Sequence, residues 1–251
     1  MRIWICGIAG YMGRAVAEEA RKQDIAVAGG IDRAAAEMPF PVYTGFSDLP
    51  DDGDVLIDFS SPAALADILA FCTCRGMPAV LCTTGYTEEQ LRQIDEAARQ
   101  IPVFRSGNMS VGIALLRRLA SQAAQVLGPG FDVEITETHH RRKKDAPSGT
   151  ALMLFHAIEE ARGDVETKAV CGRSGTESRR TPGEIGIHAL RGGTVVGEHE
   201  VAFLGDQERI RLSHSAESRS VFALGALRAA SFLMGREPGL YDMDDMLSAL
   251  L

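Results

Sequence analysis

A run of basic side chains directly before a helix start is the segment of this sequence best suited to chemistry. Residues 139–144 read His-His-Arg-Arg-Lys-Lys and lead into Pro147, Ser148, Gly149 and Thr150. Backbone amides in the first turn of a helix lack intrahelical acceptors, so cations beside them form a site for a carboxylate or a phosphate. Histidine and lysine can also donate protons. The segment therefore predicts a site that both binds and protonates an anion.

The spacing within this run makes the prediction more specific. In an extended chain His139, Arg141 and Lys143 would share one face. The helix is expected to begin at Pro147, and Ala146 is a poor N-cap, which would leave the first amides for a ligand. The alternative is a solvated basic loop. Two histidines, a lysine and a helix start in one segment favour the binding site.

The chain as a whole is acidic, with 251 residues and a formal net charge of −8. Such a surface repels nucleic acid and anionic membranes. No apolar run approaches the ~20 residues that span a bilayer, and the apolar start of the chain is too short for a signal peptide. We therefore expect a cytoplasmic protein with neither a nucleic-acid nor a membrane partner.

The five cysteines predict reduced structural thiols. Their number is odd, and a chain of this length builds a core without disulfides. Cys72 and Cys74 are close in sequence, but no second Cys/His pair follows at zinc-finger spacing. We predict no metal site.

Short apolar strands alternate with helices over the first hundred residues, which is typical of a parallel sheet with right-handed crossovers. The expected strands are Arg2–Cys6, Ile25–Ile31, Asp54–Phe59, Pro78–Cys82 and Pro102–Arg105, and the expected helices are 11–23, 62–75 and one capped by Thr87. The predicted fold class is α/β, with a Rossmann-type parallel sheet domain.

The pattern changes after residue 110. A helix over 111–127 is followed by a strand at Phe131–Thr138, the helix from Pro147 and three strand-like stretches between 184 and 213. Residues 172–183 are expected to form a mobile loop. A last helix at about 220–234 is expected to return to the first domain. We therefore expect domains at 1–110 with 219–251 and at 111–218, the second a smaller α+β domain.

Three glycines lie between the first strand and the first helix, where glycine lets the backbone approach a pyrophosphate. The predicted pyrophosphate contacts are Gly7, Ile8, Ala9, Gly10, Tyr11, Met12 and Gly13. The spacing G-x-x-G-x-x-G differs from the common G-x-G-x-x-G, so a simple tight turn is the alternative.

Asp32 ends the second expected strand nineteen positions after Gly13, close to the about 20 expected for an acid that binds the adenosine ribose. Arg33 follows it and could bind a 2′-phosphate. The pair predicts NADH and/or NADPH as the cofactor; a solvated ion pair is the alternative.

Further candidates follow the fourth and fifth strands, where ligands of open α/β sheets bind. They could orient a nicotinamide, with ordinary loop chemistry as the alternative. These residues are Cys82, Thr83, Thr84, Ser106, Gly107, Asn108 and Met109.

The basic run resembles the signature of bacterial dihydrodipicolinate reductases, also called 4-hydroxy-tetrahydrodipicolinate reductases. The residues that carry this resemblance are Glu137, His139, His140, Lys143 and Asp145 through Ala151. Other fitting segments span nearly the whole chain: the glycine motif, 58–60, 83–85, 108–112, 191–199 and 239–243.

The resemblance implies an enzyme of lysine and diaminopimelate biosynthesis. It would reduce its cyclic dicarboxylate substrate to tetrahydrodipicolinate with NADH or NADPH and with loss of water. It would be a homotetramer, with a nucleotide domain hinged to a substrate-binding and tetramerisation domain that closes on it. His139 and Lys143 would be the catalytic pair, with either as the direct proton donor. The residues implied to hold the substrate carboxylates are His140, Lys143, Ser148, Gly149 and Thr150.

Two residues depart from the family pattern. Tyr11 stands where the family often has a cation, which predicts that NADH serves at least as well as NADPH. Cys82 replaces a common glycine, and its thiol predicts sensitivity to alkylation.

Three other functions are weighed against the reductase. A different dehydrogenase of the same architecture would not need the His-His…Lys…Ser-Gly-Thr segment, and a nucleotide-binding sensor would not need its proton donors. A nucleic-acid binder conflicts with the net charge and lacks stacking aromatics.

Overall fold

A computed structural model describes residues 1–34 and 36–250. The chain forms two compact units. The first contains Met1–Val111 and the segment that begins at Arg219, and the second contains Gly112–Ser218.

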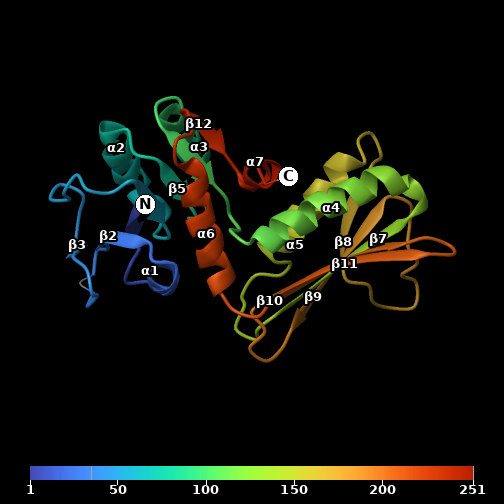
Figure 1. Ribbon diagram of the computed structural model, residues 1–251. Coiled ribbons are helices and arrows are strands. Elements are labelled where there is room, and N and C mark those ends of the chain that lie inside the picture. The colour runs from blue at the N-terminus through green and yellow to red at the C-terminus, as the bar shows by residue number, and fades with distance from the viewer. Residues whose placement is uncertain (35, 251) are drawn as a thin grey trace. The chain divides into compact units, whose positions relative to one another are not determined.

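The first unit is built on a parallel sheet in the order β12-β6-β5-β4-β1-β2-β3. Figure 1 labels β12, β5, β2 and β3 of this sheet. Its strands are β1 (Arg2–Cys6), β2 (Ala26–Ile31), β3 (Val42–Tyr43), β4 (Val55–Asp58), β5 (Ala79–Leu81), β6 (Pro102–Arg105) and β12 (Gly239–Tyr241). The predicted Rossmann-type sheet is confirmed. Sequence patterns missed β3 and β12, because strands of two or three residues carry no readable periodicity.

The helices of this unit are α1 (Tyr11–Lys22), the 3₁₀ turn η1 (Pro62–Ala64), α2 (Leu65–Arg75), α3 (Glu88–Ala98), α6 (Ser220–Leu233) and α7 (Met243–Ser248). Thr87 caps α3 as expected, and it forms a capping box with Gln90. The last long helix does return to this unit, since α6 packs on α1 and β12 pairs with β6. The carboxyl ends of the parallel strands therefore lie along one edge of a buried sheet.

The second unit holds a mixed sheet in the order β11-β10-β7-β9-β8. Its elements are α4 (Val111–Leu127), η2 (Gly128–Gly130), β7 (Asp132–His139), α5 (Gly149–Ala161), β8 (Lys168–Cys171), β9 (Glu184–Arg191), β10 (Gly197–Leu204) and β11 (Arg209–Ala216). The central strand β7 is antiparallel to β10 and parallel to β9.

One face of this second sheet changes from apolar to polar along β7. Val133 and Ile135 are fully buried in a core that includes α4 and α5. Side chains alternate along a strand, so Glu137 and His139 continue on the same face. They are also buried. The helix-covered face thus ends in a polar site at the carboxyl end of β7.

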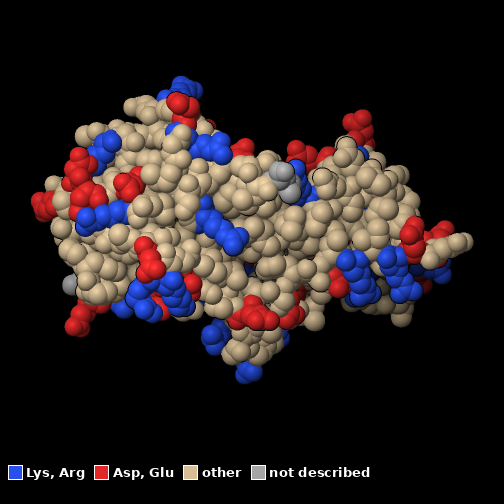
Figure 2. Space-filling view, viewed as in Figure 1, with Lys and Arg blue, Asp and Glu red and all other residues tan. Residues whose placement is uncertain are grey.

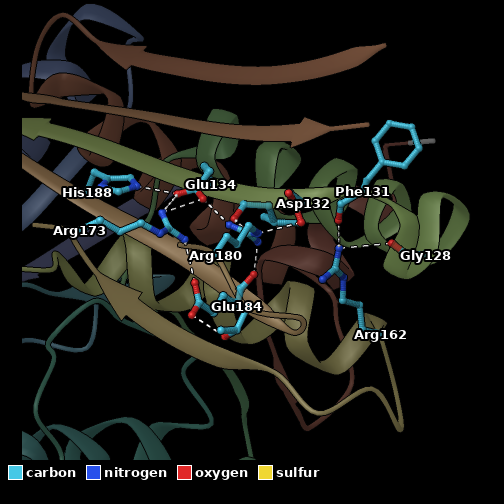
Figure 3. Close-up of polar contacts among 11 residues, drawn as sticks. Gly128, Phe131, Asp132, Glu134, Arg162, Arg173, Arg180, Glu184 and His188 are labelled. Atoms are coloured by element: carbon cyan, nitrogen blue, oxygen red, sulfur yellow. Dashed lines mark hydrogen bonds and ion pairs between the residues drawn. The ribbon is translucent and has the colours of Figure 1, made fainter. Parts of the chain in front are cut away.

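The opposite face of β7 carries a separate charged cluster (Figure 3). The Glu134 carboxylate accepts hydrogen bonds from Arg173, Arg180 and His188. A Cβ at residue 186 would lie 1.7 Å from Glu134 Oε2, so any larger residue there would displace the Glu134 carboxylate from its present position. Residues 172–183 lack helix and strand, as expected for a loop, but Arg173 and Arg180 anchor the segment to β7.

Candidate functional site

The glycine loop brings backbone amides close to the carboxyl edge of the first sheet. Gly7 has a φ of +83°, and a Cβ there would lie 2.6 Å from Phe59 O. A Cβ on Gly13 would lie 2.3 Å from Gly7 O, so α1 packs against the loop only because Gly13 lacks a side chain. Gly10 caps α1 without a side-chain hydrogen bond. The helix N-terminus can therefore serve an anionic ligand.

A cavity of about 310 Å³ lies against this loop. Asp32 and Arg33 line it, together with the segment 44–46 that follows the unpredicted strand β3. The Asp32 carboxylate accepts hydrogen bonds from the amides of Ala9 at 2.9 Å and Ala34 at 3.2 Å. Asp32 therefore ties the glycine loop to the end of β2 beside the cavity.

The remaining predicted cofactor contacts follow β5 and β6. These strands are neighbours in the sheet, so the loops beginning at Cys82 and Ser106 share an edge with the glycine loop. Ser106 Oγ donates to Asn108 O at 2.8 Å, which fixes the second loop. The structure thus brings all predicted cofactor residues to one edge.

Two features of this edge were missed. Asp58 is fully buried and accepts from Ser60 Oγ at 2.5 Å and from Tyr86 Oη at 3.4 Å; burial raises the pKa of its carboxyl. Asp58 ends β4, and this position could have indicated from the sequence that it lies at this edge. Arg219 lies over the Tyr11 ring, 5.0 Å from its centroid. A cation therefore lies beside the glycine loop, supplied from a segment too distant in sequence for any local pattern to reveal.

Glu137 is the organising residue of the polar site in the second unit. Its carboxylate accepts two hydrogen bonds from Arg191, at 2.7 and 2.8 Å, and one from the Ser148 amide at 3.0 Å. The third partner, His139 Nδ1, lies 2.6 Å away. Burial raises the Glu137 pKa, but Arg191, His139 and the Ser148 amide outweigh burial, so the net pKa is lowered. The buried group is an ionised carboxylate.

This carboxylate fixes the orientation and tautomer of His139. Because an ionised carboxylate only accepts hydrogen bonds, Nδ1 of His139 carries the proton in their 2.6 Å contact. Nε2 is then the atom available for proton exchange, and a Cβ at Gly197 would approach it to 3.1 Å. The arrangement resembles a carboxylate–histidine pair of acid–base catalysts.

Lys143 belongs to a folded turn, so the predicted alternation beyond His139 is wrong. The His140 amide donates to Val195 O, and the Lys143 amide donates to His140 O, closing a turn. Lys143 Nζ lies 3.0 Å from Asp145 Oδ2, and the hydrogen bond from Lys143 lowers the Asp145 pKa. An ion pair with Asp145 thus holds the Lys143 ammonium group within the loop that follows β7.

Helix α5 begins later than predicted. Ser148, rather than Ala146, is the N-cap, and its Oγ accepts from the Ala151 amide at 3.2 Å. Serine satisfies a first-turn amide that alanine cannot, which explains the shift. The Ser148 amide is used by Glu137, so it is not left for a ligand. Gly149 and Thr150 form the first turn, as the anion-site prediction requires.

Comparison with known protein families identifies the family of this chain. Residues 1–109 match the family model described as "Dihydrodipicolinate reductase, N-terminus", and residues 112–247 match the corresponding C-terminus. The chain belongs to the dihydrodipicolinate reductase family. The predicted family and reductase function are confirmed: it is an oxidoreductase of lysine and diaminopimelate biosynthesis.

Individual relatives support this assignment. The chain is 47% identical over 248 residues to a 4-hydroxy-tetrahydrodipicolinate reductase from Caldanaerobacter subterraneus subsp. tengcongensis, covering 98% of each protein. It is 45% identical to that of Alkaliphilus oremlandii, covering 100% of each. A dipicolinate-bound dihydrodipicolinate reductase from Paenisporosarcina sp. TG-14 has a TM-score of 0.81 at 25% identity, over 96% of this chain and 97% of that one.

Three further features concern membrane contact, metal binding and surface charge. Within residues 1–34 and 36–250, no helix is long and apolar enough to cross a bilayer. In the same described ranges, no three His, Cys, Asp or Glu side chains gather as metal ligands would. Basic and acidic side chains are interspersed on the face shown in Figure 2.

The expected sensitivity of Cys82 to alkylation is contradicted. Cys82 is only 7% exposed, and burial raises the pKa of its thiol well above the ordinary value. Because the thiolate is the nucleophile, both the low exposure and the raised pKa make the Cys82 thiol unreactive.

We predict that Ellman's reagent reacts rapidly with Cys74 and Cys171, which are exposed, and slowly with Cys6, Cys72 and Cys82, which are buried. Peptide mapping of the natively labelled reductase will identify the modified thiols, with urea-unfolded protein as the control for full labelling. Early modification of Cys82 with loss of turnover would contradict the structural explanation.

Proposed function

We propose that this reductase uses NADH or NADPH to convert 4-hydroxy-tetrahydrodipicolinate into tetrahydrodipicolinate and water. The ring loses its hydroxyl as water and gains one hydride and one proton. The observation that carries the proposal is the buried Glu137 carboxylate, which fixes His139 and Ser148 in the same loop-and-strand site as Lys143. An acid–base pair beside a helix N-terminus suits a substrate that is both protonated and anionic.

The first unit is proposed to bind the dinucleotide. The N-terminus of α1 has no side-chain cap, and the glycines before it leave its backbone uncovered by side chains. Together with the adjoining cavity, these features fit a pyrophosphate and a ribose. Asp32 would accept from the ribose hydroxyls, and the loops after β5 and β6 would orient the nicotinamide. When bound, the cofactor supplies the hydride. The tetrameric state stays a prediction, which mass measurement in solution can check.

The second unit is proposed to bind the substrate carboxylates. The Paenisporosarcina reductase was solved with dipicolinate, a planar dicarboxylate. In this chain Lys143 and His140 would contribute cationic or polar side chains. Ser148 would contribute its hydroxyl, and Gly149 and Thr150 would contribute backbone amides at the α5 N-terminus. Carboxylates are favoured there by charge-assisted hydrogen bonds and by the helix dipole.

Lys143 is proposed to deliver the proton. Hydride addition to a conjugated ring builds negative charge, which a nearby acid must neutralise. The ammonium group of Lys143 donates a proton to the ring, and Nε2 of His139, oriented through Nδ1 by Glu137, supports proton supply. The reverse order of the two groups is tested by the variants discussed below.

Coupled turnover tests the function. A dihydrodipicolinate synthase supplies the substrate from pyruvate and aspartate semialdehyde, and absorbance follows oxidation of NADH or NADPH. Oxidation that depends on the synthase is expected. If neither cofactor is oxidised while nucleotide binding is intact, this activity is excluded.

The same assay tests cofactor preference. We expect kcat/KM with NADH to equal or exceed that with NADPH, because the Asp32 carboxylate favours ribose hydroxyls and repels a 2′-phosphate. Asp32→Asn should shift the ratio towards NADPH, with Asp48→Asn as a matched control outside the cavity. A wild-type preference for NADPH of about tenfold, equal to about 1.4 kcal/mol, would contradict the prediction.

A further inference from the structure

His199 is a buried residue that the proposed reaction does not yet use. It lies on β10 opposite Glu137 on β7 and His214 on β11, and it is 5% exposed. Its Nε2 is 3.3 Å from Ser148 Oγ, and its ring meets the His139 ring edge-on at 5.2 Å between centroids. It therefore joins the carboxylate-binding serine to the acid–base histidine.

The hydrogen-bond capacity of Ser148 limits what this contact can be. A serine hydroxyl has one proton to donate and two acceptor sites. One acceptor site is filled by the Ala151 amide. Toward His199, Ser148 can therefore either donate its proton or accept one from Nε2.

The direction of the hydrogen bond between Ser148 and His199 depends on which ring nitrogen of His199 carries the proton. Among the residues that the structure describes, buried Nδ1 of His199 has no hydrogen-bond partner. If Ser148 donates to Nε2, the remaining proton of neutral His199 is buried on Nδ1 without an acceptor, and the serine offers only a lone pair to a ligand. If Nε2 donates to Ser148, the hydroxyl proton is released for a ligand.

A bound carboxylate is compatible with only one of these two hydrogen-bond directions. It has no proton to donate when ionised, so it can bind Ser148 Oγ only if the serine donates. We propose that His199 is a positioning residue that donates its Nε2 proton to Ser148 and thereby makes the serine a hydrogen-bond donor to a substrate carboxylate. This inference rests on the proposed role of Ser148 in substrate binding.

The surroundings keep His199 neutral, so the ring carries a single proton, on either Nδ1 or Nε2. Burial and the neighbouring His139 lower the His199 pKa to about 4, with smaller contributions from His214 and Lys143, while Glu137 opposes them. A cationic ring would carry protons on both nitrogens and bury an unpaired Nδ1–H. At neutral pH a single proton can therefore move between Nδ1 and Nε2 as the ligand binds.

Matched substitutions test the proposal. His199→Phe keeps the ring but removes both nitrogens, whereas His199→Gln retains an amide that can reach Ser148. By calorimetry, His199→Phe should weaken dipicolinate binding about ten- to a hundredfold, as expected for loss of a hydrogen bond to a charged group, and His199→Gln should restore most of it. His199→Phe should add little in a Ser148→Ala background. NADH affinity should be unchanged in all variants.

The results distinguish failure of the His199 proposal from failure of the proposed function. If Ser148→Ala binds dipicolinate as the wild type does, the carboxylate role of Ser148 and this inference both fail. If Ser148→Ala weakens binding and a folded His199→Phe does not, only the inference fails. Failure of wild-type turnover in the coupled assay would instead remove the proposed function.

A measurement on the unmodified enzyme avoids dependence on variant folding. Nitrogen-15 spectra of the histidine-labelled reductase distinguish the two neutral tautomers of His199. With saturating dipicolinate, the proton is expected on Nε2. A proton that stays on Nδ1 in the complex would overturn the proposal.

Discussion

Replacing Lys143 by alanine is expected to lower kcat by about 10²–10⁴-fold, the usual contribution of a positioned general acid. The ammonium group is fixed by Asp145 at 3.0 Å, and its loop is closed by the bond from the Lys143 amide to His140 O. Loss of the side chain removes the proposed proton donor and one contact to a substrate carboxylate. Both kcat and dipicolinate affinity should therefore fall, and coupled turnover with calorimetry will separate the two effects.

Two further variants test whether Lys143 itself is the proton donor. Asp145→Asn keeps the lysine but removes its ion-pair partner, and it should cost much less because the Asp145 side chain is 59% exposed. His139→Gln tests the opposite assignment. A larger loss of kcat in His139→Gln than in Lys143→Ala would make His139 the direct donor, and near-normal turnover in Lys143→Ala would exclude the lysine from catalysis.

Replacing Glu137 by alanine is expected to destabilise the second unit by about 3–5 kcal/mol, the typical cost of breaking a buried ion pair. The carboxylate is fully buried and holds Arg191, His139 and the Ser148 amide. Its removal leaves the Arg191 guanidinium without its charge partner and frees the His139 ring. Turnover should fall along with stability, measured by urea unfolding and by the coupled assay.

The pH dependence of this stability has a definite sign. The folded-state pKa of Glu137 is lowered, so the unfolded chain binds its proton more readily as the pH falls. The stabilisation is complete above the unfolded pKa of about 4.3 and is lost as the pH drops through the lower folded pKa. Glu137→Gln should therefore show a flatter acid limb than the wild type. Asp145→Ala is the surface control, with an expected cost of about 1 kcal/mol or less.

Local sequence determined the parallel sheet and much of the reactive segment. The bounds of β1, β6 and α4 follow from short apolar runs, from the helical period and from the flanking glycines and prolines. His139, Lys143 and Ser148 lie close together in sequence, so the site that we propose for them could be predicted before the fold was known. Signals of this kind come from neighbouring residues and survive without tertiary contacts.

Only the tertiary structure decided the partners that tune these residues. Arg191 reaches Glu137 because β9 pairs with β7, and His199 faces the same site because β10 pairs with β7 on the other side. Strand register is fixed by which face is buried against α4 and α5, a property of the whole sheet that no short motif carries. Cys82 was misjudged for the same reason, since burial of its thiol depends on the strands and helices packed around it and not on its neighbours in the chain.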